Sequence, residues 1–461
     1  MILIFCAFFY LSCRSWVQAP KTSSMLTNAS VFSDAQTATA AQLYLYVNSS
    51  MQAESWNQSQ NCGLLSDELN RTFSQNTPLI QYYTNSMSAI NAPGPWRNAY
   101  SYIYQCNAII EGLTNNDKVS LIVRDQLVGE SRFLRAYWYY YLTNCYGSVP
   151  LALTTDYTIN SKLGRSSPDL IYTQIINDLE SSKDLLNSNY VDASDSISTS
   201  DRVRPTKWAA ISLLARVFLF TKRYDSALKY SSQVIQNASL YSLTDSLDDV
   251  FKMNSTEAIW QLSPPSPASR NTIDGNNFIL KVRPGTGNVN AVTISNDLLN
   301  SFDRNDRRRT HWIDSIIVSG VTYYFPYKYK AYRTSVVSEY TMMLRLAEQF
   351  LIRAEALAYI SDFDGAISDI NRIRHRAGLD DYSGLKDKDS ILNEVLRQRR
   401  FEYFAEWGHR WFDLNRTGKI NYVMGLVTPS KGGIWVSSHS LFPIPQGERD
   451  IDVFLSQNDG Y

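Results

Sequence analysis

The sequence predicts a mainly α-helical protein built from tetratricopeptide-like helical hairpins and interrupted by a large irregular insertion with short strands. The first observation behind this prediction is an internal repeat at an offset of 139 positions, which relates Ala215 to Ala354 and Ala227 to Ala366. In both stretches apolar residues recur at steps of three and four, and a small Ala lets the second helix approach the first. Such hairpins stack into curved scaffolds, which usually hold other molecules rather than transform them.

The second observation is a change of pattern between residues 239 and 335. Pro264-Pro265-Ser266-Pro267 is followed by Gly, Asn and Asp punctuation and by short β-like runs such as Val321 to Tyr324. A loop-rich region of this length is more often functional than idle. We therefore expect one domain over 34–461, made of an N-terminal helical part (34–238), an insertion (239–335) and a C-terminal helical part with its tail (336–461).

Apolar periodicity predicts helices on both sides of the insertion, at 34–48, 97–112, 123–145, 169–187, 205–221, 224–237, 340–360, 363–377 and 388–407. Pro205 is expected in the first turn of its helix, and Gly378 is expected to end another. The segment 123–145 is aromatic on nearly every side, which is typical of a helix buried among others. An aromatic wall for a ligand is the alternative for that helix.

The first twelve residues, 1–12, carry no charge and run directly into Cys13. They are too few to span a bilayer, which takes about 18 residues, and they resemble the apolar part of an export signal. Ser12 before Cys13 fits lipoprotein processing, in which the thiol of Cys13 is acylated. We expect a signal peptide at 1–12 and a lipidated polar tether at 13–33. A plain cleaved signal and a buried N-terminal segment are the alternatives.

Composition and motifs argue against several functional classes. Forty-four basic residues balance forty-four acidic ones, so no overall charge favours nucleic acid. The sequence contains no zinc-hydrolase, nucleophile-elbow or phosphate-loop pattern, and we expect no catalytic residue, cofactor or metal. The acid-rich turn at 362–365 is interpreted as a helix start with capping acids rather than a calcium loop.

Aromatic residues in irregular segments favour binding without catalysis. A sugar ring lies flat on Trp or Tyr while Asn, Asp and Arg bind its hydroxyls. The candidate ligand-binding residues are Trp96 and Asn98 at a loop-to-helix junction, and Trp312, Tyr324 and Tyr327 in the insertion. For each aromatic residue, burial in the core is the alternative interpretation.

Several motifs resemble those of the SusD/RagB family of Bacteroidetes outer-membrane lipoproteins. They comprise the segment from Arg399 to Leu414, the ending from Leu441 to Pro445 and from Gln457 to Tyr461, the stretch from Val31 to Ala41, and the helix segment from Gly129 to Ala136. The chain departs from the family pattern in its lipobox and at Asp459, where Pro is commoner. The resemblance implies a SusD-like fold with four tetratricopeptide-like hairpins and a variable loop region that forms the ligand surface.

The resemblance also implies a place on the outer face of the outer membrane and a partner, a SusC-like TonB-dependent transporter. We expect a non-enzymatic, lipid-anchored protein that captures oligosaccharide and delivers it to that transporter. One alternative keeps this role with peptide cargo. Another is a tetratricopeptide-type adaptor that binds only proteins.

Overall fold

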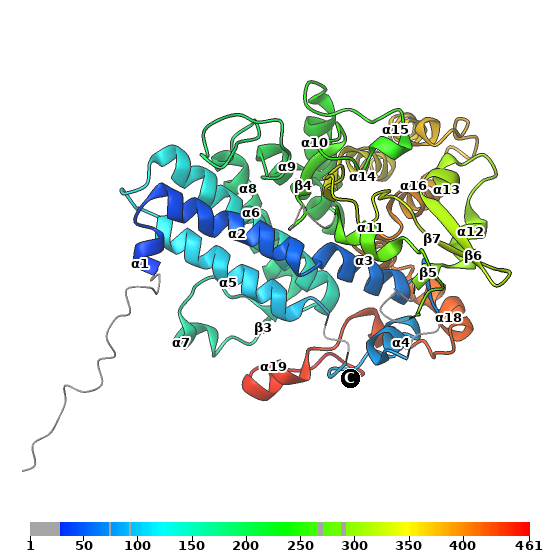
Figure 1. The fold of residues 1–461 in the computed structure, drawn as a ribbon, viewed down its shortest axis with the longest axis horizontal. Helices are drawn as coiled ribbons and strands as arrows, with labels where there is room; N and C mark the ends of the chain where they lie inside the picture. Colours follow the sequence, from blue (N-terminus) through cyan, green and yellow to red (C-terminus); the bar gives the residue numbers. More distant parts are fainter. Residues whose placement is uncertain (1–27, 73–74, 92–93, 266–270, 287–291) are drawn as a thin grey trace, which may run out of the picture.

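The computed structural model describes residues 28–461 except 73–74, 92–93, 266–270 and 287–291, and it is mainly helical (Figure 1). The first ten helices are α1 (Asn28–Val31), α2 (Ala35–Met51), α3 (Glu54–Leu65), α4 (Thr77–Tyr83), α5 (Trp96–Leu113), α6 (Leu121–Tyr146), α7 (Tyr157–Asn160), α8 (Pro168–Leu185), α9 (Lys207–Phe220) and α10 (Tyr224–Gln236). The predicted signal peptide, Cys13 and most of the tether lie outside the described residues. The end of the predicted tether forms the short helix α1 instead of irregular chain.

The later helical elements are η1 (Leu247–Asp249), α11 (Ile273–Phe278), α12 (Asn296–Ser301), α13 (Arg307–His311), α14 (Leu346–Tyr359), α15 (Phe363–Arg376), α16 (Lys388–Tyr403), α17 (His409–Arg416), α18 (Ile420–Ser430), η2 (Ser437–Ser440) and α19 (Gln446–Ile451). The strands are β1 (Leu69–Arg71), β2 (Val149–Pro150), β3 (Arg165–Ser166), β4 (Ala258–Leu262), β5 (Val292–Ile294), β6 (Ile313–Val318), β7 (Val321–Pro326) and β8 (Thr341–Arg345). These strands form antiparallel pairs, β1 with β5, β2 with β3, β4 with β8 and β6 with β7. Among the described residues, no helix combines the length and the apolar character needed to cross a membrane.

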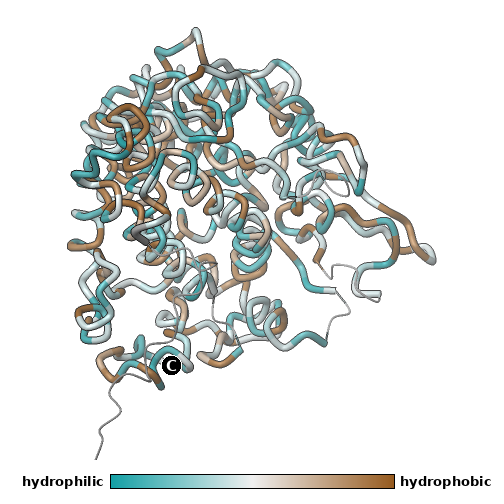
Figure 2. The backbone as a smooth tube through the Cα atoms, turned by 60° about the vertical axis from the view of Figure 1, so that its left-hand side comes forward, coloured by the Kyte–Doolittle hydropathy of each residue, from teal (hydrophilic) through white to brown (hydrophobic). Residues whose placement is uncertain are grey.

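The repeat predicted from the sequence forms two helical hairpins, α9 with α10 and α14 with α15. Ala215 and Ala354 are fully buried, as the close approach of the paired helices requires. The hairpins also contact each other, because α10 packs against α14. Across this junction the Arg216 guanidinium binds the Glu348 carboxylate at 2.6 Å, and both side chains are buried. Figure 2 shows apolar and polar stretches alternating along the helices, as amphipathic packing requires.

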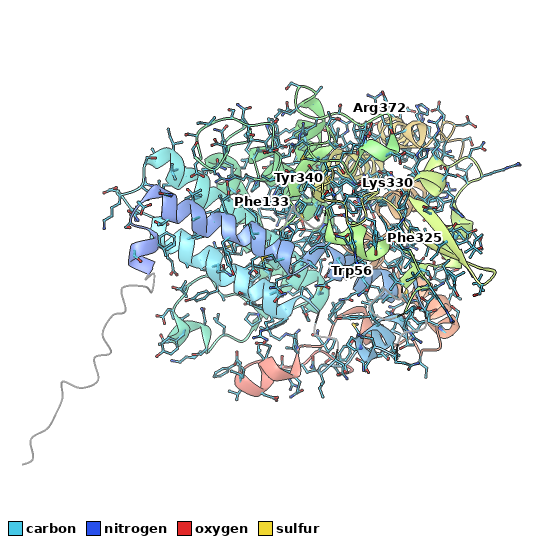
Figure 3. The ribbon with its side chains drawn as sticks, viewed as in Figure 1. Trp56, Phe133, Phe325, Lys330, Tyr340 and Arg372 are labelled. Atoms are coloured by element: carbon cyan, nitrogen blue, oxygen red, sulfur yellow. The ribbon has the colours of Figure 1, made fainter. Side chains whose placement is uncertain are left out.

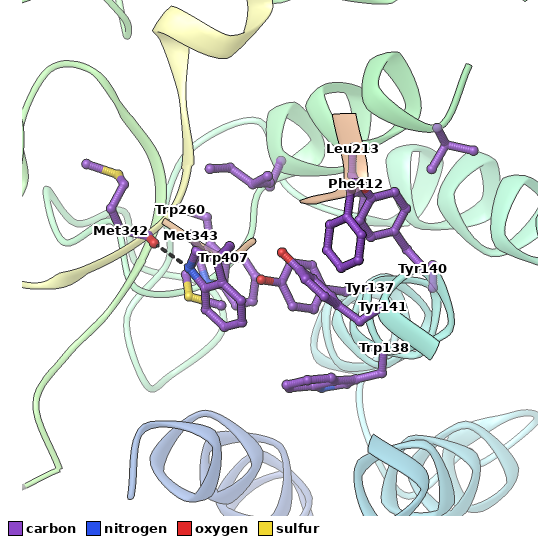
Figure 4. Close-up of a cluster of buried hydrophobic side chains, with 14 of the residues drawn as sticks. Tyr137, Trp138, Tyr140, Tyr141, Leu213, Trp260, Met342, Met343, Trp407 and Phe412 are labelled. Atoms are coloured by element: carbon purple, nitrogen blue, oxygen red, sulfur yellow. Dashed lines mark hydrogen bonds between the residues drawn. The ribbon is translucent and has the colours of Figure 1, made fainter. Parts of the chain in front are cut away.

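Helix α6 runs through the centre of the N-terminal half, beside α2, α5 and α8. Its side chains are buried on nearly every face, and Tyr137 is fully enclosed. Around Tyr137 the rings of Trp260 and Trp407 stand edge-on at centroid distances of 5.4 and 5.7 Å. Figure 4 shows this cluster, in which the indole N–H of Trp407 donates to the Met342 carbonyl oxygen at 2.9 Å. The prediction of a buried helix is confirmed.

Two predicted helices differ from the expected bounds by four residues or more at one end. Residues 341–345 form β8, which pairs with β4 in the core, so the helix begins at Leu346 rather than at residue 340. The helix from Lys388 ends at Tyr403 instead of 407, because Ala405, Trp407 and Gly408 adopt left-handed backbone angles, with φ of 53°, 49° and 76°. That turn directs the Trp407 ring into the aromatic core.

Of the three features predicted at helix ends, one is wrong and two are confirmed. Pro205 lies just before the N-cap residue Thr206 instead of inside the first turn of α9. Gly378 follows α15 with φ of +76°, as expected for a residue that ends a helix. Asp362 caps α15 by accepting a hydrogen bond from the Gly365 N–H at 3.0 Å, which confirms the interpretation of the acid-rich turn.

The insertion is fixed to the helical frame by a buried ionic cluster centred on Glu402 of α16. Three guanidinium groups surround that carboxylate. Arg345 contacts it at 2.6 Å, Arg308 from the insertion contacts it at 3.3 Å, and Arg376 also binds it. All of these side chains are buried, and the arginines hold the pKa of Glu402 well below its usual range.

Candidate ligand-binding site

A polar cavity of about 440 Å³ lies between α3, α4 and the start of α5. Its wall is dominated by amide side chains, and its described residues include a single carboxyl group, that of Glu54. The amides are those of Asn57, Gln58, Gln60, Asn61, Asn76, Asn91 and Asn98. Tyr82, Pro78 and Leu79 supply apolar surface. The size falls in the range of about 300–1,000 Å³ that is usual for small-molecule sites.

Helix α3 presents its polar face to this cavity. Glu54, Asn57, Gln58 and Asn61 recur at steps of three, one and three, so they share one side of the helix. The opposite side carries Trp56, labelled in Figure 3, whose ring packs edge-on against Phe278 of α11 at a centroid distance of 4.5 Å. The core contact therefore fixes which face of α3 looks into the cavity.

Several of the lining amides keep their hydrogen-bonding capacity for a ligand. The side chains of Gln60, Asn61 and Asn91 are partly exposed and make no hydrogen bond to any described residue. Gln58 is instead buried, and its Nε2 lies 3.1 Å from the Cys62 sulfur. An amide group offers two donors and a carbonyl acceptor, which suits hydroxyl groups that both donate and accept.

Glu54 closes one corner of the cavity. Its side chain is almost fully buried, and Oε1 accepts hydrogen bonds from Asn98 Nδ2 at 2.7 Å and from the Tyr102 hydroxyl at 3.1 Å. No described cation lies within ion-pair distance of the carboxyl group. Burial therefore raises the pKa of Glu54 from 4.5 to about 7, against the opposing effect of its two donors.

A second, smaller cavity of about 230 Å³ lies on the other side of Trp96, between α5, α7 and α19. Both of its amides donate hydrogen bonds within the protein, although the Asn160 Oδ1 is buried without a described partner. Asn107 donates to the carbonyl oxygens of Ala152 and Thr154, and its own Oδ1 accepts from Arg135. The lining exposes more apolar than polar surface, and Glu448 and Asp452 supply its carboxyl groups. We therefore take the first cavity as the candidate site.

The ligand-binding residues predicted from the sequence lie in different environments in the structure. Asn98 lines the candidate site, where its amide holds Glu54. Trp96 is only 3% exposed, and its ring packs between Tyr100 and Tyr146 at centroid distances of 5.0 and 4.9 Å. The expectation of an open Trp96 platform is therefore corrected, because the ring borders the smaller cavity from within the core.

The candidates in the insertion also differ among themselves. Trp312 is fully buried, with Phe251 against its ring and the Lys328 ammonium 4.8 Å from the ring centroid. It has no face free for a sugar, which corrects that expectation. Tyr324 and Tyr327 are partly exposed on and just after β7. Cations lie against both rings, and their contact with a ligand stays a prediction.

Sequence reasoning missed Gln60, Asn61, Asn91 and Glu54, because single amides and a lone carboxyl form no recognisable motif. For Glu54 and Asn61 the one signal is the helical spacing of polar residues on α3. Cys62, Cys106 and Cys145 are free and buried. Among the described residues, no group of three or more His, Cys, Asp or Glu side chains is arranged to hold a metal ion.

Comparison with known proteins identifies the family. A family model described as "Starch-binding associating with outer membrane" matches residues 14–219, and the model of the SusD family matches residues 313–461. Among curated proteins, the SusD-like protein P25 of Formosa agariphila is 25% identical, over 85% of this chain and 84% of its own length. A SusD-like protein of Bacteroides ovatus is 24% identical, over 72% of this chain and 67% of its own length.

Solved structures share the fold. A SusD superfamily protein from Bacteroides vulgatus superposes with a TM-score of 0.80 at 20% identity, covering 93% of this chain and 99% of its own. Surface glycan-binding protein A from Bacteroides thetaiotaomicron, solved in complex with laminarihexaose, gives a TM-score of 0.73 at 20% identity, covering 92% and 99%. The two family models together match more than half of the sequence, and the chain belongs to the SusD/RagB family.

Proposed function

We propose that this protein is a surface-exposed, lipid-anchored binding protein of the outer membrane that captures oligosaccharide without cleaving it and delivers it to a SusC-like TonB-dependent transporter. The observation that carries the binding role is the amide-lined cavity, whose Gln60, Asn61 and Asn91 have hydrogen-bonding capacity to spare. The structural neighbour that holds laminarihexaose supports a glycan as the cargo.

The proposal of binding without hydrolysis is supported by the carboxyl groups of the site. Glycoside hydrolysis usually takes a pair of Asp or Glu residues on opposite sides of the scissile bond. The described lining of the cavity holds Glu54 as its single carboxyl group. The lining suits hydrogen bonding to hydroxyl groups instead.

We propose Asn98, Tyr324 and Tyr327 as further ligand contacts. Asn98 reaches the cavity directly, and its Oδ1 makes no hydrogen bond to a described residue. The two tyrosines offer partly exposed rings on which a sugar can stack. Anchoring through Cys13 and the transporter partner are supported by the family resemblance. Anchoring is tested by comparing how the wild type and Cys13→Ser distribute between membrane and soluble fractions, where the variant is expected to become soluble. The partner is tested by co-purifying the transporter.

Calorimetry with a glycan panel and a peptide panel tests the binding role. We expect binding to at least one glycan and loss of affinity in the double variant Gln60→Ala/Asn61→Ala. Each lost hydrogen bond is worth about 0.5–1.5 kcal/mol, so the double variant weakens binding roughly 5- to 150-fold. Gln36→Ala/Asn300→Ala, which truncates two exposed amides on α2 and α12, is the matched control.

Binding to peptides alone would instead favour the alternative cargo. An unchanged affinity for glycan in the double variant would remove the cavity from the binding site. Shortening of the glycan during the titration would overturn the proposal that the protein does not cleave its cargo.

A further inference from the structure

The wall of the candidate cavity has an unusual charge balance. Its one carboxyl group, Glu54, is 4% exposed, and the described residues that line the cavity include no Lys, Arg or His. The groups that satisfy Glu54 are neutral, namely the Asn98 amide and the Tyr102 hydroxyl, and both donate to Oε1. The other carboxylate oxygen, Oε2, has no hydrogen-bond donor among the described residues.

Most other buried carboxylates among the described residues have cations beside them, whereas Glu68, Asp274 and Glu339 make no ion pair but do not line this cavity. Asp67 accepts two hydrogen bonds from Arg410 at 2.9 and 2.7 Å, and Glu348 is paired with Arg216. Burying a carboxylate without an opposite charge costs free energy, so buried charges are normally paired or bind an ion or ligand. No cation among the described residues pairs with Glu54, and the cavity is the side from which a positive charge can reach it.

The described elements packed around Glu54 supply no cation that could pair with it. Helix α5 presents Tyr102, and α2 contributes Tyr44 beside it. Helix α11 faces the next residue, Ser55, whose hydroxyl donates to Asp274 at 2.9 Å. Helix α4 brings Tyr82 to the cavity. These titratable groups are phenols and a carboxyl group, so none of them supplies a positive charge.

We propose that the cavity binds an oligosaccharide that carries a protonated amino group, with the ammonium seated against Glu54 and the neighbouring hydroxyls bound by Gln60, Asn61 and Asn91. This inference rests on the proposed glycan-binding function and names its substrate class. Uronic acids and sulfated sugars are disfavoured, because their negative charge would meet a carboxyl group and no cation.

Binding of an amino sugar should release a proton from the Glu54 carboxyl group. Burial raises the pKa of Glu54 to about 7, so at pH 6 the free protein holds a proton on most of its Glu54 side chains. An ammonium group favours the ionised carboxylate, so this proton passes to the buffer when the amino sugar binds. A neutral sugar leaves the proton where it is. Amino-sugar affinity therefore falls as the pH is lowered below 7, by up to about tenfold per pH unit.

Calorimetry at pH 6 tests the proposal with β-1,4-linked tetrasaccharides of glucosamine, N-acetylglucosamine and glucose. We expect the glucosamine tetrasaccharide to bind at least about tenfold more tightly than the other two, and to release close to one proton when buffers of different ionisation enthalpy are compared. Saturation-transfer NMR with free glucosamine, glucose and glucuronate repeats the comparison without any linkage preference.

Glu54→Gln removes the charge while keeping an acceptor for Asn98 and Tyr102. We expect this variant to lose the preference for the amine and the proton release. Asp117→Asn, which removes a fully exposed acid outside the cavity, is the matched control and keeps both. Should Glu54→Gln fail to fold, the pH series of the wild type from 5 to 6.5, where an aliphatic amine stays protonated, provides the same test.

The outcomes separate this inference from the function on which it rests. Neutral sugars that bind as tightly as glucosamine, with Gln60 and Asn61 still required, overturn the amino-sugar inference and leave glycan capture standing. A preference for glucosamine that survives Glu54→Gln, or that does not weaken as the pH falls, also overturns it. Absence of binding to every sugar in both assays overturns the inference and counts against the proposed function together with it.

Discussion

Replacing Glu402 by Gln tests the ionic cluster that fixes the insertion to the helical frame. The Glu402 side chain is fully buried among the guanidinium groups of Arg308, Arg345 and Arg376. The variant keeps the shape of the side chain and removes its charge. It also turns an amide N–H group toward at least one of the three cations, where a hydrogen-bond acceptor is needed.

The expected loss in the free energy of unfolding depends on the carboxylates that remain beside the three arginines. Removing one partner of a buried ion pair costs about 3–5 kcal/mol when the other is left uncompensated. Each arginine here keeps a second carboxylate. Asp306 binds Arg308, Glu406 binds Arg345 and Glu257 binds Arg376. We therefore expect the lower end, a loss of about 3 kcal/mol in the free energy of unfolding at pH 7.

The assay is urea unfolding followed by tryptophan fluorescence, with Asp117→Asn as a control in which one exposed charge is lost. The arginines depress the pKa of Glu402 in the folded protein below its ordinary value of 4.5. Its contribution is therefore complete above pH 4.5 and is lost as the pH falls toward the folded-state pKa. The difference between wild type and Glu402→Gln should shrink below pH 4.5. A loss under about 1 kcal/mol at pH 7, or a difference that grows in acid, would refute this reasoning.

Three further substitutions test other parts of the structure. Trp96→Ala should lower the free energy of unfolding by about 3–5 kcal/mol, and a loss of glycan binding with unchanged urea stability would show that the ring is a ligand platform after all. Gly408→Ala should lower the thermal midpoint, because φ is +76° and the new Cβ would lie 2.7 Å from the Cys62 Cβ; an unchanged midpoint would contradict the left-handed turn. Lys431→Met should cost about 1–3 kcal/mol, because the ammonium donates to carbonyl oxygens at the end of α3. Equal urea stability of that variant and the wild type would rule out this buried cap.

The sequence predicted the elements whose pattern reflects burial on one face. The hairpins containing Ala215 and Ala354 were predicted correctly because small and apolar residues recur at helical spacing where two helices pack. The segment 341–345 was mispredicted because its apolar run fits a buried helix or a buried strand equally well. Pairing with β4, distant in the sequence, decides between the two.

The candidate site was harder to predict than the fold. Helix α3 escaped prediction because amides occupy much of its surface, and those amides line a cavity. Trp96 and Trp312 show the converse difficulty. An aromatic residue in an irregular segment has the same appearance in a sequence whether the fold covers its ring or leaves it open, and here it covers both.

The central claim is that the cavity between α3, α4 and α5 holds the captured glycan. A crystal structure of the protein with an oligosaccharide that calorimetry shows to bind is its most direct test. We expect sugar in that cavity, with hydroxyl groups within hydrogen-bond distance of the Gln60, Asn61 and Asn91 amides. Sugar bound on another part of the surface while this cavity stays empty would contradict it.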